Sequence, residues 1–138
     1  MSQKILIVED DEVTALNLKM SLEKQGYTVV SIADTAIQAR NKIKIYEPDL
    51  ILLDISLQDI DDGIELAHYI HDKYALPFIF LTSHFENEII SKAKTTEPYG
   101  YIVKPFDPQS LHGTIQMALY KYEEEKKLSV DEETRRRL

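Results

Sequence analysis

Leu50-Ile51-Leu52-Leu53-Asp54 is a run of four apolar residues that ends in an acid. The apolar residues are consecutive rather than alternating with polar ones, which is typical of a strand covered on both faces. Four more short, mainly apolar runs occur at residues 5–8, 28–32, 78–81 and 101–103. Together these runs predict five short strands, most of them buried in a sheet.

The segments between these runs have the spacing of helices. Apolar residues recur every three or four positions at Ala15, Leu18 and Leu22, and again within residues 36–43 and 64–70 and along 111–122. Five repeats of strand followed by helix predict an α/β fold, a doubly wound (βα)5 sandwich around a mostly parallel sheet.

Four residues mark expected helix ends. Gly26 lies where the first helix should stop. Asp34 and Asp107 are candidate N-caps, and Pro108 would occupy the first helical position after Asp107.

The chain is acidic, and the acidity is unevenly distributed. The 138 residues carry a net charge of −8, which argues against a surface built to bind nucleic acid or anionic lipid. Residues 1–120 contain 10 basic and 18 acidic side chains, whereas residues 121–138 contain six of each. The excess acid therefore belongs to the predicted domain, and not to the charged C-terminal segment.

Several kinds of site and two kinds of targeting segment are excluded by the composition and by the short apolar runs. The chain has no cysteine, which excludes disulfides, thiolate metal sites and cysteine nucleophiles. The first apolar run is too short for a secretory signal, and no run approaches the length of a membrane span. We therefore expect a cytoplasmic protein.

Acids gather at the predicted strand ends. Glu9 and Asp10 directly follow the first strand, and Asp54 ends the third. In doubly wound sheets, ligands bind beyond the carboxyl ends of the strands. Neighbouring carboxylates repel unless a cation neutralises them, and Mg²⁺ prefers such oxygen ligands. The pattern predicts a Mg²⁺ site, although the acids at 9–12 are also compatible with a solvated loop and a helix cap.

Two further strand ends carry polar side chains. Thr82 ends the fourth strand and Lys104 follows the fifth. A hydroxyl, an ammonium and carboxylates around a cation form a site for a phosphoryl group. Taken singly, Thr82 is compatible with a helix cap and Lys104 with a solvated loop. Their joint placement at successive strand ends favours the phosphoryl site.

Over residues 3–122 the chain resembles the receiver domain of two-component response regulators, of the chemotaxis-regulator type. The resemblance is carried by ILIVEDD at 5–11, DLILLDISL at 49–57, DGIELA at 62–67, PFIFLTS at 77–83 and YIVKPF at 101–106. It implies a flavodoxin-like parallel sheet in the order 2-1-3-4-5. A receiver domain would span residues 1–122, and residues 123–138 would form a charged helical extension that frays into a tail or linker.

The resemblance also implies a role for each acid. Asp54 would be the phosphoacceptor, attacking the phosphorus of a kinase phosphohistidine to give an acyl phosphate. Asp10 would bind Mg²⁺ directly, and Glu9 would assist through water. Asp54 itself and the backbone carbonyl of Ser56 would complete the protein ligands.

The remaining implied roles concern signalling. Lys104 would pair with Asp54 and then with the phosphoryl oxygens, and the Lys104–Pro105 peptide bond would be cis. Thr82 would move its hydroxyl onto the phosphoryl group. Tyr101 would then turn inward as an aromatic switch, although it is equally compatible with a plain core aromatic residue.

Two positions are candidates for tuning the lifetime of the acyl phosphate. Ser56 and His84 each lie two residues after a site residue, Asp54 and Thr82 respectively. In the family that the chain resembles, these positions affect hydrolysis. His84 is also compatible with an ordinary surface histidine.

The resemblance implies partners rather than a small-molecule substrate. The phosphodonor would be a sensor histidine kinase or a phosphotransfer protein, and Mg²⁺ the cofactor. Output would pass through the surface of the fourth helix, fifth strand and fifth helix to a downstream protein, to a fused output domain or to a second copy. The chain would be a regulatory phosphoacceptor and not an enzyme, limited to self-catalysed phosphorylation and slow autodephosphorylation.

Three other classes fit less well. A phosphatase of the haloacid-dehalogenase type needs a second acid two residues after the nucleophile, where this chain has Ser56. A pseudo-receiver, which binds partners without phosphorylation, usually lacks an acid, the threonine or the lysine. A flavodoxin-like cofactor binder needs a phosphate-cradling loop after the first strand, and the acids at 9–12 would repel that phosphate.

Overall fold

Five strands and five helices alternate in the computed structural model, which describes residues 2–83 and 86–137. The strands are β1 (Lys4–Val8), β2 (Thr28–Ala33), β3 (Leu50–Asp54), β4 (Phe78–Thr82) and β5 (Tyr101–Val103). The helices are α1 (Glu12–Lys24), α2 (Ala36–Tyr46), α3 (Ile60–Tyr74), α4 (Asn87–Lys94) and α5 (Pro108–Arg137). This alternation confirms the α/β fold class.

The five strands form one parallel sheet in the predicted order β2-β1-β3-β4-β5. Every residue of β3 and β4 is buried, as are four of the five residues of β1. The edge strands β2 and β5 are partly exposed. The consecutive apolar runs therefore mark the three central strands, which need cover on both faces.

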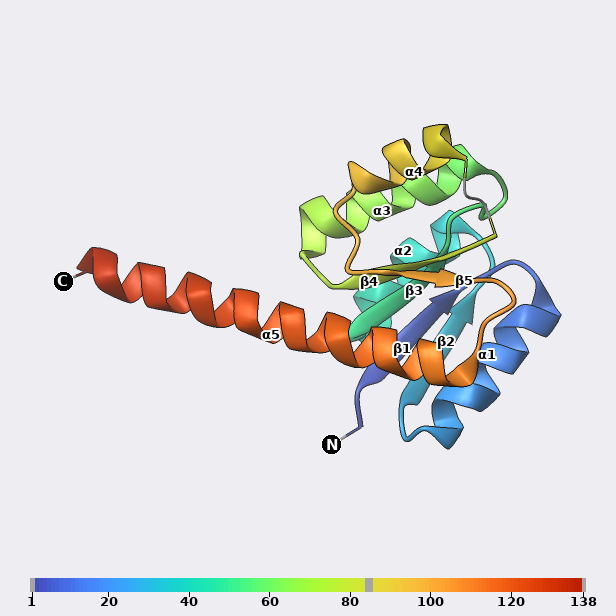
Figure 1. Cartoon of the computed structure of the whole chain (residues 1–138), viewed down its shortest axis with the longest axis horizontal. Helices are drawn as coiled ribbons and strands as arrows, with labels where there is room; N and C mark the ends of the chain where they lie inside the picture. Colours follow the sequence, from blue (N-terminus) through green and yellow to red (C-terminus); the bar gives the residue numbers. More distant parts are fainter. Residues whose placement is uncertain (1, 84–85, 138) are drawn as a thin grey trace.

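Two layers of helices provide that cover (Figure 1). Helices α2, α3 and α4 pack on one face of the sheet, and α1 and α5 pack on the other. In β1, Leu6 and Val8 face the first layer and Ile5 and Ile7 the second. Each fully buried side chain of this size contributes about 1.5–3 kcal/mol through burial.

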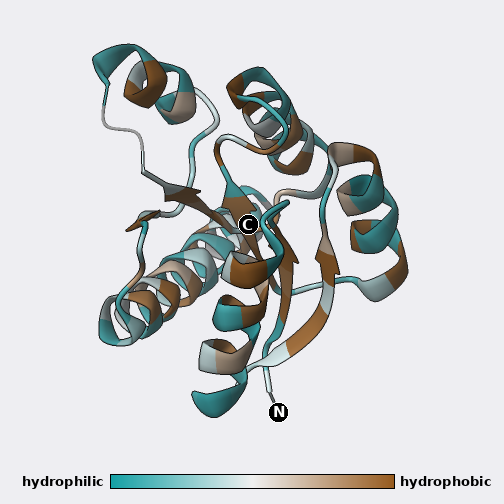
Figure 2. Cartoon of the chain, turned by 90° about the vertical axis from the view of Figure 1, so that its right-hand side faces the viewer, coloured by the Kyte–Doolittle hydropathy of each residue, from teal (hydrophilic) through white to brown (hydrophobic). Residues whose placement is uncertain are grey.

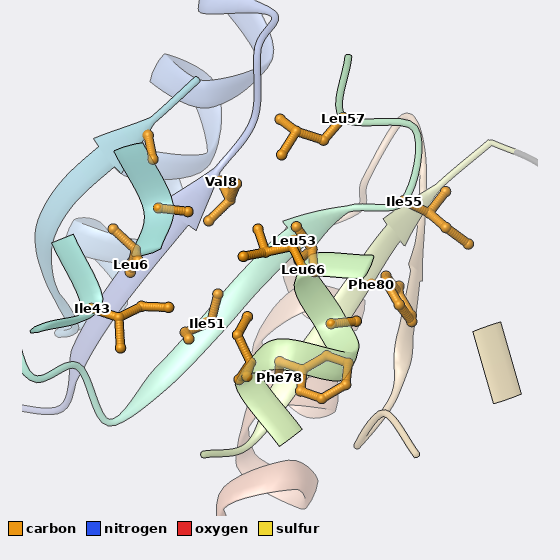
Figure 3. Close-up of a cluster of buried hydrophobic side chains, with 14 of the residues drawn as sticks. Leu6, Val8, Ile43, Ile51, Leu53, Ile55, Leu57, Leu66, Phe78 and Phe80 are labelled. Atoms are coloured by element: carbon orange, nitrogen blue, oxygen red, sulfur yellow. The ribbon is translucent and has the colours of Figure 1, made fainter. Parts of the chain in front are cut away.

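The layers differ in composition. The core beneath α2, α3 and α4 contains the aromatic pair Phe78 and Phe80, whose rings meet edge to face at 5.5 Å between centroids (Figure 3). The core beneath α1 and α5 is built from aliphatic side chains, with aromatic residues only at its margin. Each helix carries both hydrophobic and hydrophilic stretches (Figure 2), and some large apolar side chains, such as Val13 and Met20 of α1, are exposed.

Helix α2 begins one residue later than the sequence indicated. Asp34 was the expected N-cap, but Thr35 is the cap, and its side chain accepts a hydrogen bond from the backbone N–H of Gln38 at 3.1 Å. The Gln38 side chain in turn accepts from the Asp34 N–H at 3.2 Å. This reciprocal pairing resembles a capping box, which makes Thr35 a better cap than Asp34.

The other expected helix ends are confirmed. Asp107 accepts a hydrogen bond from the Ser110 N–H at 3.0 Å, and α5 begins at Pro108. Gly26 follows Gln25, the C-cap of α1, and has φ +96°, a conformation that favours glycine.

Helix α5 is longer than the domain requires, and it projects beyond the sheet (Figure 1). Its 30 residues span about 45 Å at the usual rise. Fraying was expected within residues 123–138, but the helix continues to Arg137. In this polar segment Glu124 pairs with Lys127, one turn further along, at 3.6 Å, and such a pair stabilises a helix. None of the described helices combines the length and apolar character of a membrane span.

Gly63 brings α3 close to the end of β3. A Cβ atom at this position would lie 2.3 Å from the carbonyl oxygen of Ile55 and 3.0 Å from that of Asp54. Contacts this short to backbone cannot be relieved by rotating a side chain. Gly63 is therefore required for the path of the loop that follows Asp54.

Gly63→Ala is expected to lower the free energy of unfolding by about 1–3 kcal/mol, because the added methyl group must displace backbone. Urea unfolding followed by circular dichroism measures the change. Gly113→Ala is the matched control, since a Cβ there meets nothing within 4 Å. Equal effects of the two substitutions would contradict the close-approach argument.

Candidate phosphoacceptor and metal site

The carboxyl ends of four strands bring the predicted site residues to one edge of the sheet. Glu9 follows β1, Asp54 ends β3, Thr82 ends β4 and Lys104 follows β5. The parallel register places Val8 beside Leu53, Asp54 beside Leu81 and Thr82 beside Val103. Residues far apart in the sequence therefore meet because parallel strands end on the same side.

Lys104 connects two buried carboxylates. Its Nζ lies 2.5 Å from Glu9 Oε1 and 3.2 Å from Asp54 Oδ2. The side chains of Glu9 and Asp54 are almost completely buried, whereas that of Lys104 is 22% exposed. The backbone N–H of Lys104 donates to Thr82 O at 2.9 Å, and the Lys104–Pro105 bond is cis, as predicted.

The loop after β3 orients the Asp54 carboxylate. Its Oδ1 accepts hydrogen bonds from the backbone N–H and the hydroxyl of Ser56, both at 3.0 Å. The two Asp54 oxygens therefore have different surroundings. Oδ1 is bound by Ser56, and Oδ2 faces the ammonium of Lys104.

Asp10 lies at the solvent side of the site. It is exposed, and its Oδ2 accepts from the backbone N–H of Gln58 at 3.4 Å. Gln58 has φ +56° and was not anticipated from the sequence, because glutamine carries no signal for a left-handed backbone. Glu9 Oε2 accepts from the Asp11 N–H at 3.3 Å.

Burial and proximity shift the proton affinities of the three central groups. Burial, together with the hydrogen bond to Asp54, raises the pKa of Glu9 to about 7. Burial alone would raise the pKa of Asp54, but the bond from Glu9 and the charge of Lys104 hold it below its usual range. Burial opposes the charge on Lys104, yet the carboxylates raise its pKa. Near neutral pH the site therefore holds an ionised Asp54 and a charged Lys104.

Three carboxylates are placed to share one cation. Glu9, Asp10 and Asp54 each offer an oxygen, and these oxygens lie within 4.8 Å of one another. Two of the three are buried and one is exposed, so the cluster opens to solvent on the Asp10 side. Carboxylate oxygens with access to water suit Mg²⁺, which keeps several of its waters. The residues present thus fit the ion that the sequence predicted.

The candidate switch residues lie on β4 and β5, the two strands that lead to Thr82 and Lys104. The ring of Tyr101 stacks on Phe80 at 6.1 Å between centroids and packs against the core beneath α2, α3 and α4. Its hydroxyl is buried and has no hydrogen-bond partner among the described residues. Thr82 is buried at the end of β4. His84 lies outside the described residues.

Comparison with known proteins agrees with this geometry. Residues 5–116 match the family described as the response regulator receiver domain. This match covers most of the chain, and the protein therefore belongs to that family.

Similar proteins include regulators and solved receiver domains. The chain is 28% identical to the transcriptional regulatory protein PdtaR of Mycobacterium tuberculosis over 122 residues, 88% of this chain and 59% of that protein. It is 37% identical to KdpE of Staphylococcus aureus over 117 residues, 85% of this chain and 50% of that protein. The signal receiver domain of a modulated diguanylate cyclase from Desulfovibrio desulfuricans G20 superimposes with a TM-score of 0.84 at 36% identity, covering 91% of this chain and 99% of that one. The chain thus spans about half to three fifths of the length of these two regulators.

In metal-free protein, Glu9→Gln is expected to stabilise the fold more at pH 8 than at pH 5. The unfolded chain releases the Glu9 proton near its ordinary pKa of 4.5, whereas the folded protein keeps it until about 7. Rising pH between these values therefore favours unfolding of the wild type, and glutamine cannot ionise. The difference should reach about 1–3 kcal/mol.

Urea unfolding in EDTA at both pH values measures this difference. Glu12→Gln is the control, because it removes an exposed acid close to the site. The same stabilisation by Glu9→Gln at pH 5 and pH 8 would show that Glu9 ionises alike in the folded and unfolded chains.

Proposed function

We propose that Asp54 accepts a phosphoryl group from the phosphohistidine of a sensor histidine kinase or a phosphotransfer protein. The observation that carries this proposal is the buried Asp54 carboxylate, with one oxygen held by Ser56 and the other 3.2 Å from Lys104. Such an arrangement combines an ionised nucleophile with a fixed positive charge. The chain is then a regulatory phosphoacceptor, and not an enzyme that turns over a substrate.

The two carboxylate oxygens of Asp54 have different surroundings, and this difference indicates which of them attacks phosphorus. Oδ1 is occupied by two hydrogen bonds from Ser56, so Oδ2 is the nucleophile. Oδ2 donates an electron pair to phosphorus, the phosphorus–nitrogen bond breaks, and its electron pair stays on the histidine nitrogen. The products are an acyl phosphate on Asp54 and, with one proton taken up by the ring from solvent, a free imidazole on the donor.

Repulsion between the carboxylate and the incoming phosphoryl oxygens must be offset. Lys104 lies beside Oδ2 and supplies one positive charge there. Glu9, Asp10, Asp54 and the Ser56 carbonyl would hold Mg²⁺, which would supply further positive charge to the phosphoryl oxygens. After transfer, Lys104 is placed to leave its Asp54 partner for a phosphoryl oxygen.

The signal would leave through the surface formed by α4, β5 and α5. The new phosphoryl oxygens offer an acceptor to the hydroxyl of Thr82, which in turn changes the packing around Tyr101. The same elements expose large apolar side chains, among them Val103, Met117 and Tyr120. A downstream protein, a fused output domain or a second copy of the chain would bind there.

Incubation with acetyl phosphate and Mg²⁺ is expected to add one phosphoryl group per chain, measured by intact-mass spectrometry. Asp54→Asn should abolish the addition, because the amide cannot act as the nucleophile. Asp59→Asn, in the same loop, should leave it unchanged, since asparagine also caps α3. An unmodified wild-type protein that also fails to bind Mg²⁺ would indicate a pseudo-receiver instead.

Lys104→Ala is expected to retain Mg²⁺ binding and to lose the structural response. The substitution removes a positive charge beside the carboxylates, so the metal affinity measured by calorimetry should not fall. NMR spectra should show that acetyl phosphate no longer shifts the Tyr101 ring signals, whereas Lys94→Ala, on exposed α4, should respond as the wild type does. A normal Tyr101 response in Lys104→Ala would remove Lys104 from the signalling role.

A further inference from the structure

Tyr99 joins the start of β5 to the middle of α5. Its hydroxyl donates a hydrogen bond to Glu125 Oε2 at 2.5 Å. Its ring meets that of Tyr122 edge to face, with 6.2 Å between centroids, and the Lys121 ammonium lies 5.3 Å from its centroid. Tyr99 therefore contacts three side chains of α5, which lie within little more than one helical turn.

The other end of Tyr99 is fixed to the sheet. Its backbone N–H donates to Phe78 O at 2.8 Å, so its main chain moves with β4 and β5. Burial and the bond to Glu125 raise the pKa of its hydroxyl, which therefore keeps its proton and remains a donor throughout the physiological range. The contact therefore joins residues hydrogen-bonded to the sheet with a helix, through a hydroxyl that stays protonated.

The position of Glu125 along α5 is important. Up to this point α5 is packed on the sheet through Leu111, Ile115 and Ala118. Beyond it, the described side chains are exposed, at 126–130 and 132–136. Residues 126–137 form an arm of about 18 Å at the usual helical rise (Figure 1). Glu125 thus lies where the packed part of α5 gives way to the projecting part.

Tyr99 is also close to the candidate switch. Tyr99 and Tyr101 are separated by Gly100 alone, and both line one cavity of about 640 Å³ between α3, α4, β5 and α5. Lys121 and Glu125 line the same cavity from α5. A shift of Tyr101 or of β5 therefore has room to change how Tyr99 meets α5.

We propose that Tyr99 is a positioning residue that fixes the direction of the α5 arm and makes it follow β5. Loss of the Tyr99–Glu125 hydrogen bond frees the arm, and displacement of Tyr101 redirects it. The arm, rather than a flat surface alone, then carries the output. We call the contact of Tyr99 with Glu125 the clamp. The clamp is inferred from the contacts of Tyr99 alone, and only its control by phosphorylation rests on the proposed function.

Distances between two spin labels test the clamp directly. The chain has no cysteine, so labels at cysteines introduced in place of Asn17 on α1 and Glu132 on the arm are unambiguous. The otherwise wild-type protein should give a narrow distance distribution, and Tyr99→Phe a broader or shifted one. Tyr120→Phe, which removes the hydroxyl of an exposed tyrosine on α5, should leave the distance distribution unchanged. Identical distributions for Tyr99→Phe and the wild type would overturn the clamp.

Substitutions of Glu125, the hydrogen-bond acceptor, distinguish loss of the hydrogen bond from a general disturbance of α5. Glu125→Leu should broaden the distribution as Tyr99→Phe does, whereas Glu125→Gln, which keeps an acceptor oxygen, should restore the narrow one. Glu124→Leu is the matched control on the adjacent residue, which pairs with Lys127 within the helix. If Glu124→Leu broadens the distribution as strongly as Glu125→Leu, the Tyr99–Glu125 bond is not what holds the arm.

The coupling to β5 is tested without any phosphodonor. Tyr101→Ala removes the ring that stacks on Phe80 and should shift or broaden the arm distribution. Tyr101→Phe removes only a hydroxyl that has no hydrogen-bond partner within residues 2–83 and 86–137, and should leave the distribution unchanged. An unaltered distribution in Tyr101→Ala, with the fold intact by circular dichroism, would overturn the coupling.

A final comparison adds acetyl phosphate and Mg²⁺ and follows modification by mass. Phosphorylated wild type should show a shifted arm, and phosphorylated Tyr99→Phe should not. A wild-type protein that takes up no phosphoryl group would contradict the proposed function, while the clamp and its coupling to Tyr101 would still be decided by the unphosphorylated variants.

Discussion

The ammonium of Lys104 between two buried carboxylates is the interaction on which the working edge of the sheet depends. Glu9 and Asp54 lie out of contact with water, where a second negative charge is costly unless a cation offsets it. Lys104 supplies that cation from a different strand. The same ion pair therefore joins the ends of β1, β3 and β5 and keeps Asp54 ionised.

The sheet makes this interaction possible because its register leaves little freedom at the strand ends. The central strands are buried on both faces, and a shift of one residue would move every side chain to the opposite core. Asp54 is further restrained by Ser56, and the loop that carries both is held close to α3 by the absence of a Cβ at Gly63. Rigid packing thus positions the acids at the strand ends.

Much of this architecture was predictable from local patterns. Continuous apolar runs marked the buried strands, and the acids, Thr82 and Lys104 were found at the strand ends. Local patterns were less reliable at helix ends. Asp34 and Thr35 are both good caps, and only the reciprocal bond with Gln38 decided between them. The continuation of α5 to Arg137 was not predicted, because a change to strongly charged composition does not by itself say whether a helix goes on or ends.

The class of fold, the family and the candidate site residues follow from the order and spacing of residues, because strand periodicity and strand-end placement are local properties. The side-chain contacts that those residues make within the chain do not follow from order and spacing. That Lys104 bridges Glu9 and Asp54, that Gln58 reaches Asp10, and that Tyr99 holds Glu125 depend on contacts between segments distant in the chain. Only the packed tertiary structure brings such groups within hydrogen-bond distance, since side-chain contacts depend on distances of a few ångströms that sequence spacing does not specify.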